Sequence, residues 1–208
     1  MTSRICSVWM LTLLAAVATC LTATAALTQT LSGDGLVKAL RQGGYVIVMR
    51  HASSPREVPD KAAANPDNVN LERQLDETGR ATAAAMGKAL RDLKIPIGDI
   101  FTSPTYRALE TIRLAQFGNA KTATELGDGG QSMQSVAEAQ GMWLRERITQ
   151  APKETNTLYV THMPNIARAF PQITGVADGE ALVFRPDGKG GAPLAARIKI
   201  EDWARLRP

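Results

Sequence analysis

The sequence predicts an α/β domain, a three-layer sandwich with a mostly parallel central sheet and helices on both faces. Short β-branched apolar runs alternate along the chain with helical patterns, as they do in strand–helix–strand units. The runs 45–49 and 157–161 carry no charge, which is typical of strands buried on both faces of a sheet. With 208 residues, of which 44% are hydrophobic, the chain is long enough for a sizeable core and is not a largely disordered one.

The first 25 residues are expected to be a secretory signal peptide. Arg4 precedes an apolar stretch over 8–18, and small residues follow it up to Ala25, where we expect cleavage. An uncleaved membrane anchor is the alternative, but the densely apolar part has only about half the roughly 20 residues of a spanning helix. We therefore expect a periplasmic or secreted protein with no stable membrane insertion after cleavage.

Residues 26–208 are interpreted as a single domain, because no repeat or low-complexity linker interrupts them. Cleavage would remove both cysteines, Cys6 and Cys20, and with them any thiol chemistry. The formal net charge of +4 suits an anionic substrate, whereas no run of Lys or Arg indicates a nucleic-acid surface.

The first part of the domain is expected to contain two strand–helix units. Residues 45–49 are apolar and β-branched, which predicts a buried strand. Residues 76–93 are Ala-rich with apolar residues at helical spacing, and Pro96 lies just beyond the end of this helix. A second short strand is expected over 98–102, and a helix with proline in its first turn over 104–116.

The second part continues the alternation. A third strand is expected over 121–126, and a buried strand over 157–161. The apolar runs 181–184 and 196–200 flank a turn-rich segment and predict a hairpin at a sheet edge. Between these strands, residues 132–148 predict an amphipathic helix whose inner face consists of Met133, Val136, Trp143, Leu144 and Ile148.

The two histidines of the chain, His51 and His162, each directly follow a buried-strand pattern. A parallel sheet brings such positions to one edge, where ligands bind in α/β folds. Arg50 adjoins His51, and Arg107 lies in the first turn of a predicted helix, whose N-terminus favours an anion. Arginine also pairs well with phosphate oxygens.

The alternative is structural. A histidine taken alone is more often a satisfied core or surface residue, and each arginine could belong to a surface ion pair with Glu110. The repeated placement at strand ends favours a site.

The motifs around these residues resemble the histidine phosphatase superfamily in its phosphoglycerate-mutase-like branch, branch 1. That family has an Arg-His-Gly motif, a Ser-x-x-x-Arg-Ala-x-x-Thr motif and a later histidine, and the matching residues here are 50–52, 103–111 and His162. The segment 73–80 resembles its Leu-x-x-x-Gly segment. Ala52 and Met163 stand where the family usually or often has glycine, which could narrow the pocket or shift substrate choice.

The resemblance implies a covalent phosphohistidine mechanism without metal or cofactor. His51 would attack phosphorus, and Arg50, Arg107 and His162 would hold the phosphoryl oxygens. The resemblance places the general acid between the second and third motifs, where Glu125 is the first choice and Asp128 the second.

Other polar residues are less strongly indicated as site residues. Ser103 is expected to cap the helix that carries Arg107, with phosphate binding as the alternative. Arg56, Lys61 and Arg73 lie in a polar loop between 52 and 73, and a solvated position is the favoured interpretation for each.

The expected function is an exported, metal-independent phosphomonoester hydrolase acting on a small phosphorylated substrate or a cell-envelope phosphosugar. The alternative is a catalytically weak member of the same fold that only binds phosphate. A mutase is disfavoured by the signal peptide, because glycolytic substrates are cytoplasmic.

Overall fold

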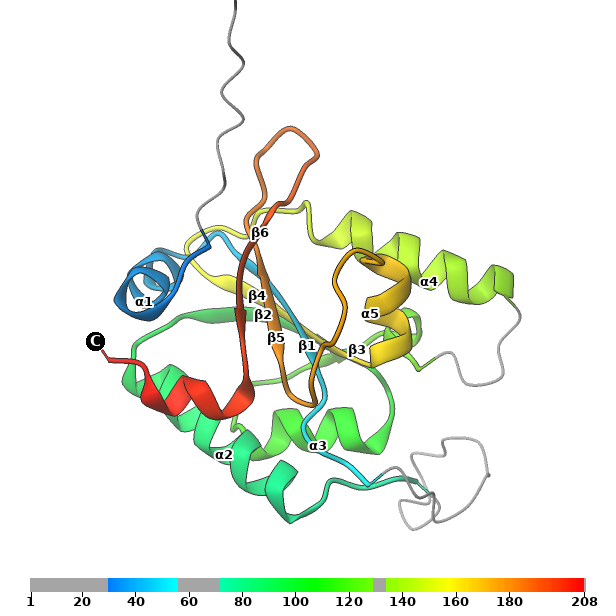
Figure 1. Cartoon of the computed structure of the whole chain (residues 1–208), viewed down its shortest axis with the longest axis horizontal. Helices are drawn as coiled ribbons and strands as arrows, with labels where there is room; N and C mark the ends of the chain where they lie inside the picture. The colour runs from blue at the N-terminus through cyan, green and yellow to red at the C-terminus, as the bar shows by residue number, and fades with distance from the viewer. Residues whose placement is uncertain (1–29, 56–71, 129–133, 208) are drawn as a thin grey trace, which may run out of the picture.

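A computed structural model describes residues 30–55, 72–128 and 134–207 (Figure 1). The expected signal peptide, its anchor alternative, Arg56, Lys61 and Met133 lie outside the described residues. Within the described ranges, no helix has the length and apolar character needed to cross a membrane.

A six-stranded sheet forms the centre of the fold, in the order β3–β2–β4–β1–β5–β6. Four strands run parallel, whereas β5 is antiparallel to β1 and forms an antiparallel hairpin with β6 at the edge. The predicted fold class is confirmed. The strands are β1 (Val46–Arg50), β2 (Ile97–Thr102), β3 (Lys121–Thr122), β4 (Asn156–Thr161), β5 (Ala181–Phe184) and β6 (Leu194–Ile198).

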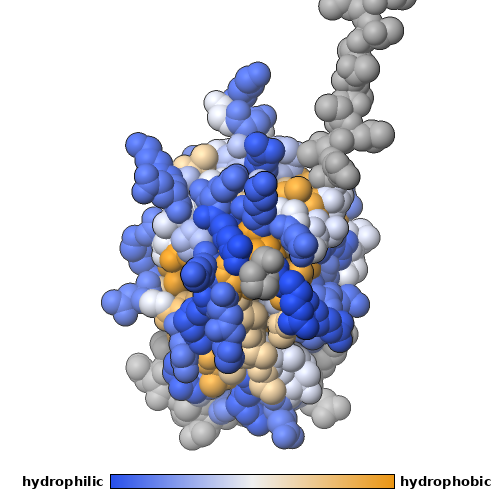
Figure 2. Space-filling model, turned by 90° about the vertical axis from the view of Figure 1, so that its left-hand side faces the viewer, coloured by the Kyte–Doolittle hydropathy of each residue, from blue (hydrophilic) through white to orange (hydrophobic). Residues whose placement is uncertain are grey.

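Helices cover both faces of the sheet and enclose two hydrophobic clusters (Figure 1). One face packs against α1 (Gly33–Gln42), α2 (Glu77–Asp92), α3 (Tyr106–Leu114) and the 3₁₀ helix η3 (Ile200–Arg205). The other packs against α4 (Gln134–Arg147), α5 (Met163–Ala169) and the 3₁₀ turn η2 (Thr124–Leu126). Hydrophilic side chains cover most of the face at the left of Figure 1, with small groups of hydrophobic ones between them (Figure 2).

The alternation of β1 side chains explains why its apolar run is uninterrupted. Ile47 and Met49 lie in the cluster beneath α2, whereas Val46 and Val48 lie in the cluster beneath α4 and α5. Successive side chains of a strand point to opposite faces, so a strand covered on both faces needs apolar residues at every position.

The parallel strands bring chemically active residues to one edge of the sheet. His51 follows the end of β1, Ser103 the end of β2 and His162 the end of β4. Because β5 runs antiparallel to β1, with Met49 opposite Ala181, the segment before β5 lies at this same edge. Residues from both halves of the chain therefore meet there.

Some elements differ from the prediction. Only 121–122 of the expected strand over 121–126 pair with β2, and the chain then turns into η2. The inner face of α4 is wrong at Val136, which is 43% exposed. Ala137 and Gly141 pack inward instead, because small residues let α5 approach closely: a Cβ at Gly141 would lie 3.0 Å from Cβ of Arg168. Helices α1 and α5 were not predicted.

Gly87 is where α2 approaches α3 most closely, since a methyl group there would overlap the carbonyl oxygen of Ala115. We expect Gly87→Ala to lower the free energy of unfolding by roughly 1–3 kcal/mol, although alanine is the better helix former. Urea unfolding followed by circular dichroism would measure this change.

Gly35→Ala in α1 is the matched control. A Cβ at Gly35 meets nothing within 4 Å, so this change should stabilise the protein by up to about 1 kcal/mol. Equal effects of the two substitutions would contradict the packing described for α2 and α3.

Candidate active site

A pocket of about 580 Å³ lies at the carboxyl edge of the parallel strands. Its charged and polar wall contains Arg50, His51, Arg73, Arg107, Asp128 and His162. Its apolar wall comes from the first half of α5, with Met163, Pro164 and Ala167. Two histidines and two arginines that are far apart in sequence, as predicted, thus line one pocket.

The guanidinium group of Arg107 lies between the two imidazoles. Its Nε donates a hydrogen bond to Nε2 of His51 over 3.2 Å, and its Nη2 donates to Nδ1 of His162 over 3.1 Å. The histidine rings are 5.1 Å apart and inclined by 61°. Because Arg107 is in the first turn of α3, the start of this helix fixes the spacing between both rings.

The partners of the ring nitrogens define the tautomers. A guanidinium only donates, so Nε2 of His51 and Nδ1 of His162 must accept and carry no proton. Nδ1 of His51 donates to the carbonyl oxygen of Ala52 over 2.8 Å. His51 therefore presents an Nε2 lone pair, which is the form that a nucleophilic imidazole needs.

Burial and positive neighbours keep both rings neutral. His51 and His162 are each 2% exposed. Desolvation, followed by the charges of nearby arginines, lowers the pKa of His51 to about 3. The same causes hold the pKa of His162 well below its usual value.

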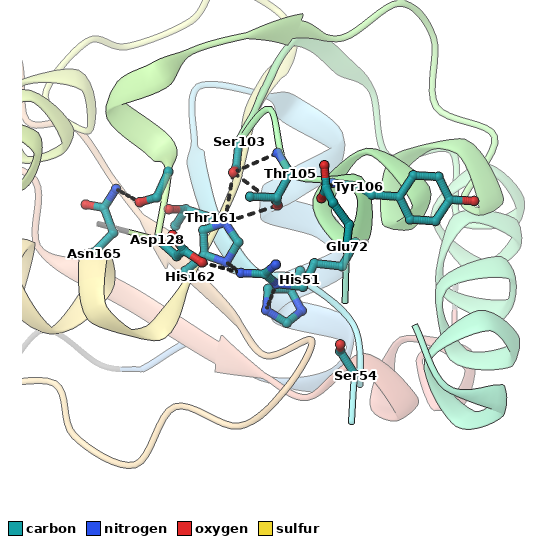
Figure 3. A network of polar contacts seen from close by, with 12 residues as sticks. His51, Ser54, Glu72, Ser103, Thr105, Tyr106, Asp128, Thr161, His162 and Asn165 are labelled. Carbon is teal, nitrogen blue, oxygen red and sulfur yellow. Dashed lines mark hydrogen bonds and ion pairs between the residues drawn. The ribbon is translucent and has the colours of Figure 1, made fainter. Parts of the chain in front are cut away.

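His162 is held from its other side by hydroxyl groups (Figure 3). Its Nε2 lies 2.8 Å from Oγ of Ser103 and 3.3 Å from Oγ1 of Thr105, so the neutral ring donates its proton to this pair. The prediction that Ser103 caps α3 is wrong, since the N-cap residue is Thr105 and the helix begins at Tyr106. Ser103 instead orients the second histidine.

Arg50 reaches away from His51 toward the segment before β5. Its Nη1 donates to the carbonyl oxygen of Val176 over 3.0 Å, and its Nη2 lies 2.5 Å from Asp178. Glu110, considered as a partner for Arg50 or Arg107, pairs with Arg113 instead. No sequence motif pointed to Asp178, because it comes from the turn before an antiparallel strand.

The two candidate acids lie in different places. Oδ2 of Asp128 is 2.6 Å from Nη2 of Arg107, and Asp128 lines the pocket. Glu125, the first choice from sequence, does not line it, and its Oε2 accepts a hydrogen bond from the neighbouring hydroxyl of Thr124 over 3.4 Å. Asn165 holds the turn between them by donating to the carbonyl oxygen of Glu125 over 2.6 Å (Figure 3).

The first two motifs are joined through Thr111. Its Oγ1 accepts a hydrogen bond from the backbone N–H of Ala52 and donates one to the carbonyl oxygen of Arg107. Ala52 is fully buried in the core and does not line the pocket, so its methyl group does not narrow the site. Met163, the other departure from the family pattern, does line it.

Arg73 is the polar residue that the sequence reasoning misplaced. A solvated position was the favoured interpretation, but its side chain lines the pocket and is only partly exposed. The available signal in the sequence was the position of Arg73 shortly before the start of α2. In the described ranges, no three His, Cys, Asp or Glu side chains are grouped as metal ligands would be.

Comparison with known proteins gives a family match for part of the sequence and solved structures with the same fold. Residues 46–126 match the model of the histidine phosphatase superfamily, branch 1, which confirms the predicted resemblance. The match contains the first two motifs and ends before His162. No curated protein matches the chain.

Solved structures share the fold. The protein histidine phosphatase SixA, complexed with tungstate, has 17% identity and a TM-score of 0.53 over 76% of this chain and 98% of its own. YhfR of Bacillus stearothermophilus has 18% identity and a TM-score of 0.53, covering 73% and 95%. Phosphoserine phosphatase of Entamoeba histolytica, in complex with 3-phosphoglyceric acid, has 13% and 0.52, covering 74% and 95%.

The neutral histidines make stability depend on pH. Their pKa values are lower in the folded chain than in the unfolded one, so only the unfolded chain gains protons as pH falls below about 6.5. We expect the free energy of unfolding to fall toward pH 5, with a limiting slope of about 1.4 kcal/mol per pH unit for each histidine. Chemical unfolding at a series of pH values would measure it.

His51→Asn and His162→Asn should each flatten this slope by one histidine's share. NMR of the wild-type rings provides the direct check, because neither should titrate between pH 7 and 5. A ring that titrates normally near pH 6.5 would contradict the burial and tautomers described here.

Proposed function

We propose that this protein is an exported phosphomonoester hydrolase that works through a phosphohistidine intermediate on a small phosphorylated substrate, with cell-envelope phosphosugars in its range. The observation that carries the proposal is the unprotonated Nε2 of His51, facing Arg107 in a pocket that also contains His162. The match of residues 46–126 to the histidine phosphatase superfamily supports it. Neither a metal, a cofactor nor a nucleic acid has a part in it.

The first half of the reaction forms a phosphorus–nitrogen bond. The Nε2 lone pair of His51 attacks phosphorus, and the bond between phosphorus and the leaving oxygen breaks. Arg107 and Arg50 bind the equatorial oxygens, where the negative charge is spread during phosphoryl transfer. The neutral His162, expected from the sequence to bind these oxygens too, gives its one N–H to Ser103 and Thr105 and instead positions the Arg107 guanidinium through Nδ1. The phosphoryl oxygens replace Asp128 on Arg107, and Asp128 takes over the proton of the phosphate monoanion and passes it to the leaving oxygen, because it is the pocket carboxyl group next to Arg107.

The second half returns the enzyme to its starting state. Water attacks the phosphohistidine and gives its proton to the Asp128 carboxylate. The phosphorus–nitrogen bond breaks, and its electron pair returns to Nε2 of His51. Inorganic phosphate then leaves the pocket with this proton, and the Asp128 carboxylate pairs with Arg107 again.

The histidine role is tested by His51→Ala. We expect turnover of p-nitrophenyl phosphate to fall to background, and a denatured wild-type sample quenched during turnover to carry phosphate that is stable to alkali and labile to acid. Arg107→Ala should lower the rate about 10²–10³-fold, since one charge-stabilising donor is lost. Activity of His51→Ala close to wild type would rule out the proposal, and phosphate binding without turnover would support a phosphate-binding module instead.

The two carboxylates are separated by comparing Asp128→Asn with Glu125→Gln. Asp128→Asn should slow hydrolysis of alkyl phosphates about 10²–10⁴-fold, the usual range for a lost general acid. It should affect aryl phosphates less, because a phenolate leaves without full protonation. Glu125→Gln should leave both rates near wild type, and the reverse pattern would return the role to Glu125.

A further inference from the structure

Arg73 differs from the other two arginines of the pocket in forming no salt bridge with a described residue, although the charges of Asp128 and Asp178 reach it and oppose the lowering of its pKa by burial. Arg50 is paired with Asp178 and Arg107 with Asp128. The Nε of Arg73 is buried, and no described residue accepts a hydrogen bond from it. The buried Nε–H of Arg73 thus faces no acceptor among the described residues, which is unfavourable unless a ligand in the pocket accepts from it.

The backbone around Arg73 is fixed from both sides. On one side, the buried carboxylate of Glu72 accepts a hydrogen bond from the backbone N–H of Tyr106, at the start of the helix that carries Arg107. On the other, the hydroxyl of Ser54 donates to the carbonyl oxygen of Gln74 over 2.6 Å. These contacts fasten Arg73 between the start of α3 and the segment that follows His51.

Two further contacts continue this attachment. The hydroxyl of Ser53 donates to Asp76 over 2.6 Å, and the backbone N–H of Asp76 donates to the carbonyl oxygen of Ser53 over 3.1 Å. Asp76 also caps α2 by accepting from the N–H of Gly79. The position of Arg73 therefore follows from the way α2 begins and does not depend on a contact of its own side chain.

The electrostatics agree with this geometry. Burial and the charge of Arg107 lower the pKa of Arg73, although a guanidinium remains protonated at ordinary pH. The charge of Arg73 depresses the pKa of both His51 and His162 more than that of Arg50 does. Arg73 is thus close enough to act on the groups that would surround the phosphoryl group.

We propose that Arg73 is a third arginine of the substrate site and binds an oxygen of the transferring phosphoryl group directly. The proposal deepens the proposed function and rests on it for the identity of the anion. The Nη1 and Nη2 donors of Arg50 are already bound to Val176 and Asp178, and its buried Nε, like that of Arg73, has no described acceptor. Arg73, which has no salt bridge to a described residue, is therefore less committed to the protein than Arg50. Arg107 and Arg73 would then bind the anion from two elements, α3 and the segment before α2.

The test compares binding of inorganic phosphate to the wild-type chain, Arg73→Ala and Arg73→Lys by titration calorimetry. Losing a charge-assisted hydrogen bond should weaken binding about ten- to hundredfold in Arg73→Ala. Arg73→Lys should recover part of the loss, because it restores the charge without the planar fork. The same order should hold for kcat/KM on p-nitrophenyl phosphate.

Arg205→Ala is the matched control, since Arg205 is an exposed arginine on η3 and is not a pocket residue. It should bind phosphate as the wild type does. Thermal unfolding identifies a variant that does not fold, and Arg73→Gln then replaces Arg73→Ala. Wild-type phosphate affinity in a folded Arg73→Ala or Arg73→Gln would overturn the proposal.

The two proposals fail in different ways. If the wild type forms a phosphohistidine and turns over while Arg73→Ala binds phosphate normally, the hydrolase stands and the role of Arg73 is lost. If Arg73→Ala loses phosphate affinity but the wild type has no turnover, the role of Arg73 stands and the hydrolase is lost. A wild type that binds no phosphate would overturn both.

Discussion

The site depends on one guanidinium group placed between two neutral imidazoles. Arg107 only donates hydrogen bonds, so it requires His51 and His162 each to offer a bare nitrogen toward it. Protonating either ring would turn an attractive contact into a repulsive one in a buried place. Burial and the charge of Arg107 lower the pKa of both histidines, and the contact with Arg107 fixes their tautomers, so that Nε2 of His51 stays unprotonated.

The fold supplies this contact from three separate strand ends. The parallel order of β2, β4 and β1 puts the residues after each strand at one edge, and α3 begins there with Arg107 in its first turn. Thr111, one turn later in α3, accepts a hydrogen bond from the backbone of Ala52 and so connects the helix to the segment that follows His51. A shift of α3 along its axis would disturb both histidines at once.

Sequence patterns predicted the sheet and the convergence at its edge because these follow from simple rules. Apolar runs mark strands buried on both faces, and parallel strands place their ends together. The patterns did not identify short elements such as α5, which has seven residues. They also missed the inward face of α4, where the small residues Ala137 and Gly141 pack inward and let α5 approach closely. Apolar side chains at helical spacing carry no information about such close approaches.

The polar details were harder to predict for a related reason. Ser103 followed by Pro104 has the pattern of a helix cap, yet the hydroxyl is taken by His162, a residue 59 positions away. Glu125 and Asp128 are three residues apart, and only the shape of the η2 turn decides which one faces the pocket. The positions of Asp178 and Arg73 at the pocket could not be predicted from the sequence, because the residues around them lie in distant segments.

The two walls of the pocket differ in polarity and come from different elements of the fold. The charged residues come from the end of β1, the start of α3 and the segments before α2 and after η2, whereas the apolar wall is one side of the short helix α5, with Met163, Pro164 and Ala167. Substitutions along α5 can therefore reshape the apolar side of the pocket while the charged side chains stay in place. If the pocket acts as proposed, changes in this one short helix would alter which organic group fits and leave the groups proposed to bind phosphate unchanged.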